Sequence, residues 1–399
     1  MMLRPATIAF LLLLTGVSAQ AGNLPPHTWK TGGYVGVVLR DYPQSPVENR
    51  EGNTLALHLA PEWILRQGPY RFILSPDVRL ENAGSGRSRA DFNELNLSAR
   101  YGKTIVEFGV TRLFWGVTES RHLENIINPP DLAADFSGET TLGIGLLRIL
   151  QPINLGQLEV ILSPWDRDPR YPGQHARLRT ALPILDNVRY PDGRPTAWAI
   201  RVATARGIFD THLYYFSGLD REAILTPQFD TTAQPISLQA SRWPIRQWGL
   251  DVQAPIGSLL LKGEAIQRSG YSRSFIAVVL GGEYTFNSVA DSARDLSLML
   301  EYQEDDRPDD APLTAMKSAY YGGIRMALND PNSSELTIGL SYNPQSQAQL
   351  WSGDFSRRIA ENVTLEGNLT IFSSVDGHPT LSGFSQDSRI ELQVKRHFH

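Results

Sequence analysis

Polar and apolar side chains alternate along most of this chain, in segments of about ten residues. Between residues 295 and 304, Leu298 and Leu300 fall on one parity whereas Glu301 falls on the other, and the last segment, 389–399, alternates in the same way. Strict alternation predicts a β-strand with one apolar face and one wet face. The pattern does not by itself say which of the two faces points outward.

About eighteen segments follow this pattern, each close to the length that a tilted membrane strand needs, roughly nine to eleven residues. We expect strands at 31–41, 54–65, 70–81, 91–101, 104–113, 141–150, 156–163, 196–205, 208–217, 246–254, 257–268, 273–286, 295–304, 317–328, 335–343, 348–357, 363–373 and 388–398.

The connections between these segments alternate in length. Short ones, mostly with Gly or Pro as tight hairpins require, lie at 66–69, 101–103, 151–155, 205–207 and 255–256. Longer ones lie at 43–53, 114–140, 163–195, 218–245, 304–316 and 374–387. Short periplasmic turns and long extracellular loops are typical of outer-membrane barrels, whereas a soluble β-sandwich, the alternative, needs no such alternation. We therefore predict an all-β fold, a transmembrane antiparallel β-barrel of about 16–18 strands.

In such a barrel the apolar parity faces lipid and the polar parity faces a water-filled lumen, where charged side chains remain hydrated. The charged residues that we expect to line the lumen are Glu107, Arg201, Asp251, Lys262, Glu264, Glu301, Arg325 and Glu366. Acidic and basic residues nearly balance among the inward-facing positions, and these positions show no continuous row of residues with the same charge. We therefore expect a weak charge preference.

The N-terminus carries the features of an export signal. Arg4 precedes an apolar run over 8–17, and 18–21 ends in an A-x-A cleavage pattern. We expect a signal peptide at 1–21, a short periplasmic segment at 22–30 and the barrel at 31–399. After residue 21 no apolar stretch reaches the roughly eighteen residues of a membrane helix.

Composition agrees with an exported barrel. The chain of 399 residues has no cysteine, and a barrel closed by backbone hydrogen bonds needs no disulfide. Its net charge of −5 argues against nucleic acid as a partner. Mean hydropathy is negative, as expected when only alternate residues face lipid.

Segment 114–140 is the first long connection rich in charge, and it would form the third external loop. Trp115, Leu123 and 126–127 are apolar residues that could fix this loop to the barrel wall. As candidate pore-constriction residues we single out Arg112, Glu119, Arg121, His122, Glu124 and Asp131. The sequence leaves open whether the loop folds into the lumen or only covers the mouth.

This same segment carries a resemblance to a known family. Segment 114–123, followed by 126–128 and Asp131, is similar to a family of uncharacterised porin-like outer-membrane proteins of Gram-negative bacteria, with further similarity at 281–286, 295–302, 305–307 and 324–330. The ending at Phe398 likewise resembles the C-terminal signature of outer-membrane barrels. The resemblance implies a barrel in the cell outer membrane; it implies no substrate and no catalytic residues.

Enzymatic chemistry finds little support. The histidines are scattered without metal-ligand spacing, and no strand-to-helix serine elbow is present, so we expect no catalytic residues, metal or cofactor. We predict a porin-like channel for passive diffusion of small hydrophilic solutes, narrowed by 114–140. The alternative is a non-conducting structural or export-associated barrel with periplasmic partners. Expected partners are outer-membrane lipid, lipopolysaccharide and the barrel-assembly machinery, with a homo-oligomer left open.

Overall fold

The computed structural model describes residues 27–46, 49–82, 86–378 and 380–399, so the expected signal peptide lies outside the described residues. The elements are β1 (His27–Asp41), β2 (Thr54–Gln67), β3 (Tyr70–Glu81), β4 (Arg89–Tyr101), β5 (Thr104–Thr111), β6 (Ile144–Ile153), β7 (Gly156–Trp165), β8 (Ala197–Arg206), β9 (Phe209–Leu219), β10 (Ile224–Phe229), β11 (Pro235–Ser241), β12 (Pro244–Ile256), β13 (Leu259–Ser269), β14 (Phe275–Phe286), η1 (Val289–Asp291), β15 (Asp295–Asp305), β16 (Ala319–Ala327), β17 (Glu335–Tyr342), β18 (Gln349–Ala360), β19 (Val363–Ser373), η2 (Ser382–Phe384) and β20 (Arg389–His397).

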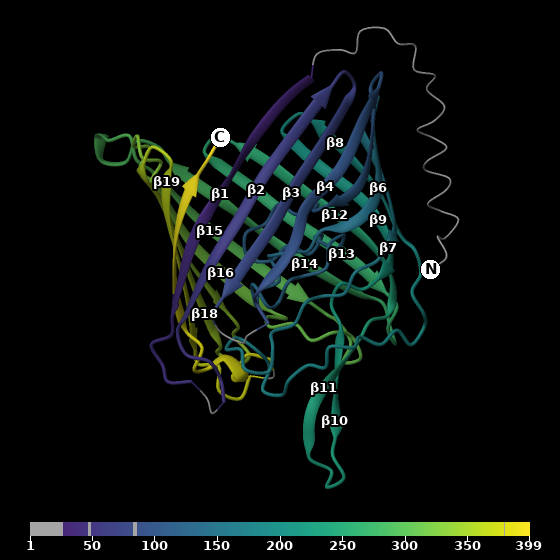
Figure 1. Cartoon of the computed structure of the whole chain (residues 1–399), viewed down its shortest axis with the longest axis vertical. Helices are drawn as coiled ribbons and strands as arrows, with labels where there is room; N and C mark the ends of the chain where they lie inside the picture. The colour runs from purple at the N-terminus through teal and green to yellow at the C-terminus, as the bar shows by residue number, and fades with distance from the viewer. Residues whose placement is uncertain (1–26, 47–48, 83–85, 379) are drawn as a thin grey trace.

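Eighteen of these strands form one closed antiparallel barrel (Figure 1). Neighbours in sequence pair in space, with β9 followed directly by β12. The barrel closes because β1 lies between β2 and β20, which places Leu39 opposite both Leu55 and Leu392. Closure pairs every strand on both sides, as a chain surrounded by lipid requires.

The two parities of each strand meet different surroundings. On β15, Leu300 is 67% exposed on the outer surface, whereas the neighbouring Glu301 is 2% exposed inside. Outer-surface aromatic rings gather near strand ends: Trp198 packs on Tyr215 at 5.1 Å, and Tyr215 on Trp248 at 4.8 Å between ring centroids. An apolar outer band edged by aromatic rings is the surface of a transmembrane barrel.

The structure confirms the predicted fold class, and each of the eighteen expected segments coincides with a barrel strand. Two differences matter. Strand β1 begins at His27, four residues before the expected start at 31, and residues 27–30 pair with β2 from Lys30↔Ile64 to His27↔Gln67. The connection 218–245, expected as a plain loop, contains the hairpin β10–β11, which extends away from the barrel (Figure 1).

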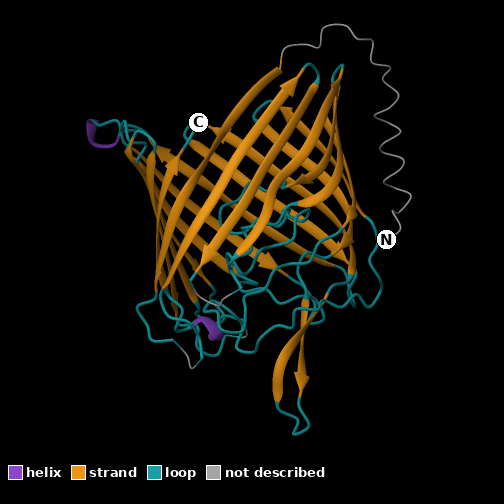
Figure 2. Cartoon of the chain, in the orientation of Figure 1, coloured by secondary structure: helices purple, strands orange, loops and turns teal. Residues whose placement is uncertain are grey.

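The two ends of the barrel differ in their connections. Short turns join β2 to β3 and β4 to β5 at the short-turn end, whereas long connections gather at the opposite, long-loop end (Figure 2). Four of these are used below: L1 (42–53), L3 (112–143), L4 (166–196) and L9 (374–388). Within the described part of the chain, no helix is long and apolar enough to cross a membrane.

Candidate functional site

L3 leaves the barrel wall at the end of β5 and folds back into the lumen. Asn128 closes the neck of the loop: its Oδ1 accepts from the Leu113 amide at 2.8 Å, and its Nδ2 donates to the carbonyls of Thr111 at 2.9 Å and Leu142 at 2.8 Å. These three bonds satisfy main-chain groups where β5 and β6 separate. L3, between β5 and β6, is therefore a compact loop that is closed at its base.

Apolar side chains fix L3 to one side of the barrel. Trp115 packs against Tyr214 of β9 with ring centroids 4.9 Å apart, and the guanidinium of Arg201 lies 5.0 Å from the Trp115 ring. The buried cluster around this contact comprises Leu113, Trp115, Ile126 and Ile127 of L3 with Ile144, Leu146, Ile161, Ala197, Ala199, Tyr214, Phe216 and Ile245. Leu123 belongs to a second cluster with Ile266, Phe275, Ala277, Val279 and Ala311. The structure thus confirms the apolar anchors expected for this loop.

Two inward-facing carboxylates of the barrel wall accept hydrogen bonds from the backbone amides of L3. Glu264 of β13 accepts from the amides of Val117 at 2.6 Å and Thr118 at 3.0 Å, and from the Thr118 hydroxyl at 2.7 Å. Glu301 of β15 accepts from the amides of Glu119 and Ser120, both at 2.8 Å. Both carboxylates point into the barrel, as predicted. L3 covers them, so they serve as acceptors for the loop and do not line open water.

The tip of L3 joins a closed ring of four ion pairs. Glu119 binds Lys262 of β13 at 2.7 Å and Arg325 of β16 at 3.0 Å, and Glu283 of β14 binds the same two cations, each at 3.2 Å. Burial alone would raise the pKa of the Glu119 carboxyl, but the hydrogen bond from Lys262 and the charges of Lys262 and Arg325 outweigh it and lower that pKa. Glu119 is therefore held as a carboxylate at neutral pH.

Arg121 and His122 extend this contact on either side. Arg121 binds Asp305 of β15 at 3.0 Å, and His122 lies 3.3 Å from Glu139 within L3. Gly116 has a φ of +137°, and a Cβ there would lie 2.9 Å from the His122 ring nitrogen and 3.0 Å from Glu264 Oε1. This position therefore needs glycine, because both the conformation and the space exclude a side chain.

Glu124 is the exception among the charged residues of L3. Its side chain is 0% exposed, and among the described residues neither carboxyl oxygen has a hydrogen-bond donor. Burial and the adjacent Asp251 carboxyl raise its pKa to about 11, so Glu124 is neutral at pH 7. Asp251 is already held by His212 at 2.6 Å and Arg201 at 3.5 Å.

The structure separates the six predicted constriction residues into two groups. Glu119, Arg121, His122 and Glu124 lie in the lumen against β12–β16, as described above. Asp131 instead lies at the base of L3, where it binds Arg89 of β4 and Arg170 of L4, the latter at 3.0 Å. Arg112 is also at the base, with one long contact of 3.5 Å to the Thr141 carbonyl.

The remaining predicted lumen residues form local pairs on the inner wall. Glu107 faces Arg148 at 3.6 Å, and Glu366 binds Lys395 at 2.6 Å. Arg201, Asp251, Lys262, Glu264, Glu301 and Arg325 are described above, and their role as lining of an open pore stays a prediction.

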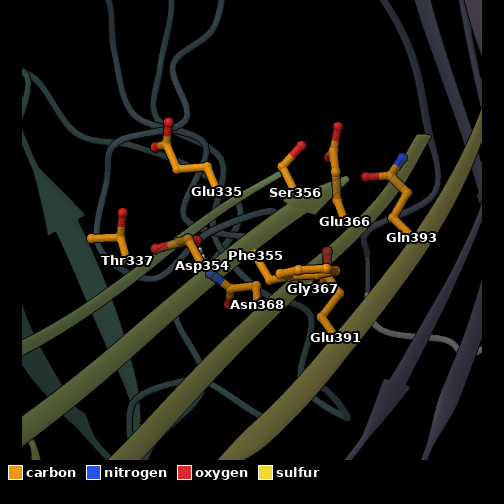
Figure 3. A pocket seen from close by; sticks show the side chains of 10 residues that line it. All are labelled: Glu335, Thr337, Asp354, Phe355, Ser356, Glu366, Gly367, Asn368, Glu391 and Gln393. Atoms are coloured by element: carbon orange, nitrogen blue, oxygen red, sulfur yellow. Dashed lines mark hydrogen bonds between the residues drawn. The ribbon is translucent and has the colours of Figure 1, made fainter. Parts of the chain in front are cut away.

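The lumen is open along the strands that L3 does not cover. A cavity of about 270 Å³ borders β17–β20 and is lined by Glu335, Thr337, Asp354, Phe355, Ser356, Glu366, Gly367, Asn368, Glu391 and Gln393. Apart from Phe355 and Gly367 these residues are polar, and Figure 3 shows them on neighbouring strands. A second cavity of about 490 Å³ lies near the short-turn end along β2–β6. L3 thus divides the lumen into a filled half and a polar, hollow half.

L4 crosses the long-loop end, an arrangement that the sequence did not reveal. Arg177 of L4 is fully buried, donates to Asp387 of L9 at 2.8 Å and donates to the Gln44 carbonyl of L1 at 3.1 Å. Leu178 lies in a cluster with Tyr42, Met316, Ala319, Ala348, Phe372, Val375 and Leu381. No local signal marked this pairing, because its partners are separated by more than a hundred residues.

Comparisons with known proteins agree with the fold. No family model matches the sequence, and no curated protein matches it. Among solved structures, Wzi from Escherichia coli, a carbohydrate-binding outer-membrane β-barrel involved in group 1 capsule assembly, is 10% identical with a TM-score of 0.50 over 90% of this chain and 83% of that one. A mutant porin of Rh. blastica is 12% identical with a TM-score of 0.45 over 93% of this chain and 100% of that one. At 10% identity the likeness to Wzi shows the fold alone.

Proposed function

We propose that this protein is an outer-membrane channel, porin-like in action, through which small hydrophilic solutes diffuse passively. The observation that carries the proposal is the division of the lumen by L3. The loop fills the half of the barrel along β6–β9 and β12–β15, while polar side chains on β17–β20 border open space (Figure 3). A narrowed but wet passage is the expected product of this asymmetry.

The membrane orientation follows from the connections. Short turns face the periplasm and long loops face outward in outer-membrane barrels, so L1, L4 and L9 would meet lipopolysaccharide. Export through a cleaved signal at 1–21 and insertion by the barrel-assembly machinery belong to the same proposal. L3 then acts as the constriction: Glu119, Arg121 and His122 stand at the boundary between the filled and the open half.

A second candidate function rests on L4. Because Arg177 and Leu178 tie L4 to L1 and L9, this loop covers part of the external mouth. A mouth that stays covered would make the protein a non-conducting structural or export-associated barrel. Covering loops and an open half-lumen predict different currents, so the two candidates can be separated directly.

Single-channel recording in planar bilayers is the test. We expect the purified barrel to give stable current steps, and a variant with 117–124 replaced by a short Gly-Ser linker to give larger ones. This replacement removes Leu123 but keeps Trp115, Ile126, Ile127 and Asn128, so the neck and the apolar cluster around Trp115 remain. A correctly folded barrel that carries no current would contradict the channel. An unchanged conductance in the deletion variant would show that the constriction is not formed by L3.

A further inference from the structure

Two arginines face each other directly on the inner wall near the short-turn end. Arg66 of β2 and Arg71 of β3 are cross-strand partners in the register. Arg71 also pairs with Ser98 of β4, and Arg100 lies two residues farther along β4, toward the turn, on the same face. All three arginines line the 490 Å³ cavity along β2–β6. Three guanidinium groups from consecutive strands therefore share one water-filled space.

No hydrogen bond or ion pair joins these charges to a carboxylate within the described residues, although the Glu94 carboxylate of β4 interacts with Arg71 at longer range. None of the three side chains makes a hydrogen bond or an ion pair there, and all three are exposed to the lumen. Arg148, farther along the same wall, is different: it binds Glu159 at 2.6 Å and faces Glu107 at 3.6 Å. The wall can thus supply a carboxylate to an arginine, but within the described residues it gives Arg66, Arg71 and Arg100 no direct ion pair.

Such an arrangement is costly for a barrel that gains nothing from it. Like charges directly opposite in an antiparallel sheet are destabilising, and a guanidinium does not relieve the repulsion by losing a proton. Glu94 of β4 offsets part of this repulsion at longer range, and an anion from solution can offset the rest. Planar guanidinium groups present paired N–H donors that match carboxylate and phosphate oxygens.

We infer that Arg66, Arg71 and Arg100 form a binding site for small free anions that carry a carboxylate or phosphate group. The Ser98 hydroxyl, which also lines the cavity, donates to the Arg71 carbonyl at 3.4 Å and joins β4 to β3 beside the site. Glu107 on one side of the site repels anions, and so do Glu335, Asp354, Glu366 and Glu391 on the β17–β20 wall. The anion is therefore held on the β2–β4 side, at the periplasmic entrance if the orientation proposed above holds.

The site itself does not require conduction, although its role as a selector of solutes rests on the proposed channel. Binding is therefore measured without a current. Inorganic phosphate is added to the detergent-solubilised barrel, and its ³¹P linewidth is followed as a function of protein concentration. We expect the native protein to broaden the signal, and we expect added chloride salt to reverse the broadening because the contact is ionic.

The test variant is R66Q/R71Q/R100Q. Its matched control is R206Q/R294Q/R396Q, which removes the same charge at exposed positions outside the cavity. We expect the dissociation constant for phosphate to rise about tenfold or more in the test variant and to stay unchanged in the control. Equal binding by the test variant, an equal loss in the control, or no broadening by the native protein would each overturn the site.

Thermal unfolding keeps the inference testable if phosphate binds weakly. Without phosphate, R71Q should unfold at a higher temperature than the native protein, because one repulsive partner is gone. With phosphate, the native protein should gain stability and the triple variant should not. A native barrel that binds phosphate but carries no current would support the site and refute the channel. A conducting barrel whose phosphate binding does not depend on these arginines would support the channel and refute the site.

Discussion

Replacing Glu124 by Gln should strengthen the docking of L3 at neutral pH. Glu124 has an ordinary pKa of 4.5 in water, and burial beside Asp251 raises that pKa to about 11. When L3 leaves the wall, the carboxyl is hydrated and ionises. At pH 7 the docked loop must therefore keep a proton that the free loop releases, at a cost of about 3 kcal/mol. A neutral amide avoids this cost and can donate to the Asp251 carboxylate.

The sign of the pH dependence follows from the same shift. The pKa of Glu124 is higher when L3 is docked than when L3 is released. Docking is therefore strongest below about pH 4.5, and it weakens by about 1.4 kcal/mol per pH unit until the pH reaches the pKa of Glu124 in the docked loop. Burial lowers the pKa of His122, but the neighbouring carboxylates of Glu264 and Glu139, at 3.8 and 3.3 Å, outweigh it and raise that pKa, which adds a change in the same direction. Measurements above the titration of His122 therefore isolate the contribution of Glu124.

The absence of native cysteine permits a clean assay. Ala199 is 0% exposed beneath Trp115 and 126–127, so a thiol in A199C reacts only when L3 lifts from the wall. Its labelling rate, corrected for thiol ionisation, should increase toward tenfold per pH unit above neutrality, and E124Q should lower it by about two orders of magnitude at pH 7. The matched change E119Q should raise it, because Glu119 is held ionised by Lys262 and Arg325. Faster labelling in E124Q, or an unchanged pH slope, would refute the reasoning.

Three further changes have defined outcomes. Trp115→Ala should weaken L3 docking by about 3 kcal/mol or more and speed the labelling of A199C, since it empties the apolar anchor; an unchanged rate would place the anchor elsewhere. Asp387→Asn should free L4 by leaving Arg177 without its buried partner, seen as faster trypsin cleavage there, and equal cleavage would show that L4 is held by other contacts. Removal of 398–399 should lower the yield of heat-modifiable, folded barrel in the outer membrane, and an unchanged yield would deny the tail its role as an assembly signal.

The barrel could be predicted from the sequence because its rule is local. Alternation within each segment sets which side chains face lipid, and alternating connection lengths set the two ends, so both are readable without knowing any distant contact. Strand ends do not follow this local rule. His27 pairs with Gln67, and a pairing of this kind depends on the partner strand rather than on the residue itself.

The site was only partly predictable, since its contacts are long-range. The apolar residues of L3 indicate an anchor. They do not indicate that the carboxylates of Glu264 and Glu301, on distant strands, accept hydrogen bonds from the backbone of this loop. The ring around Glu119 joins residues more than 140 positions apart. Arg66 and Arg71 face each other because the hairpin turns at 68–69, whereas the turn expected at 66–69 does not place them opposite each other.

Cysteine modification during single-channel recording tests the divided lumen most directly. Asn368 lines the open side, whereas Ala277 is 0% exposed beneath Leu123. In N368C, a bulky methanethiosulfonate reagent should lower the unitary conductance, and in A277C the same reagent should leave it unchanged. Equal block at the two positions, or none in a fully labelled N368C barrel, would contradict a passage along β17–β20 beside a docked L3.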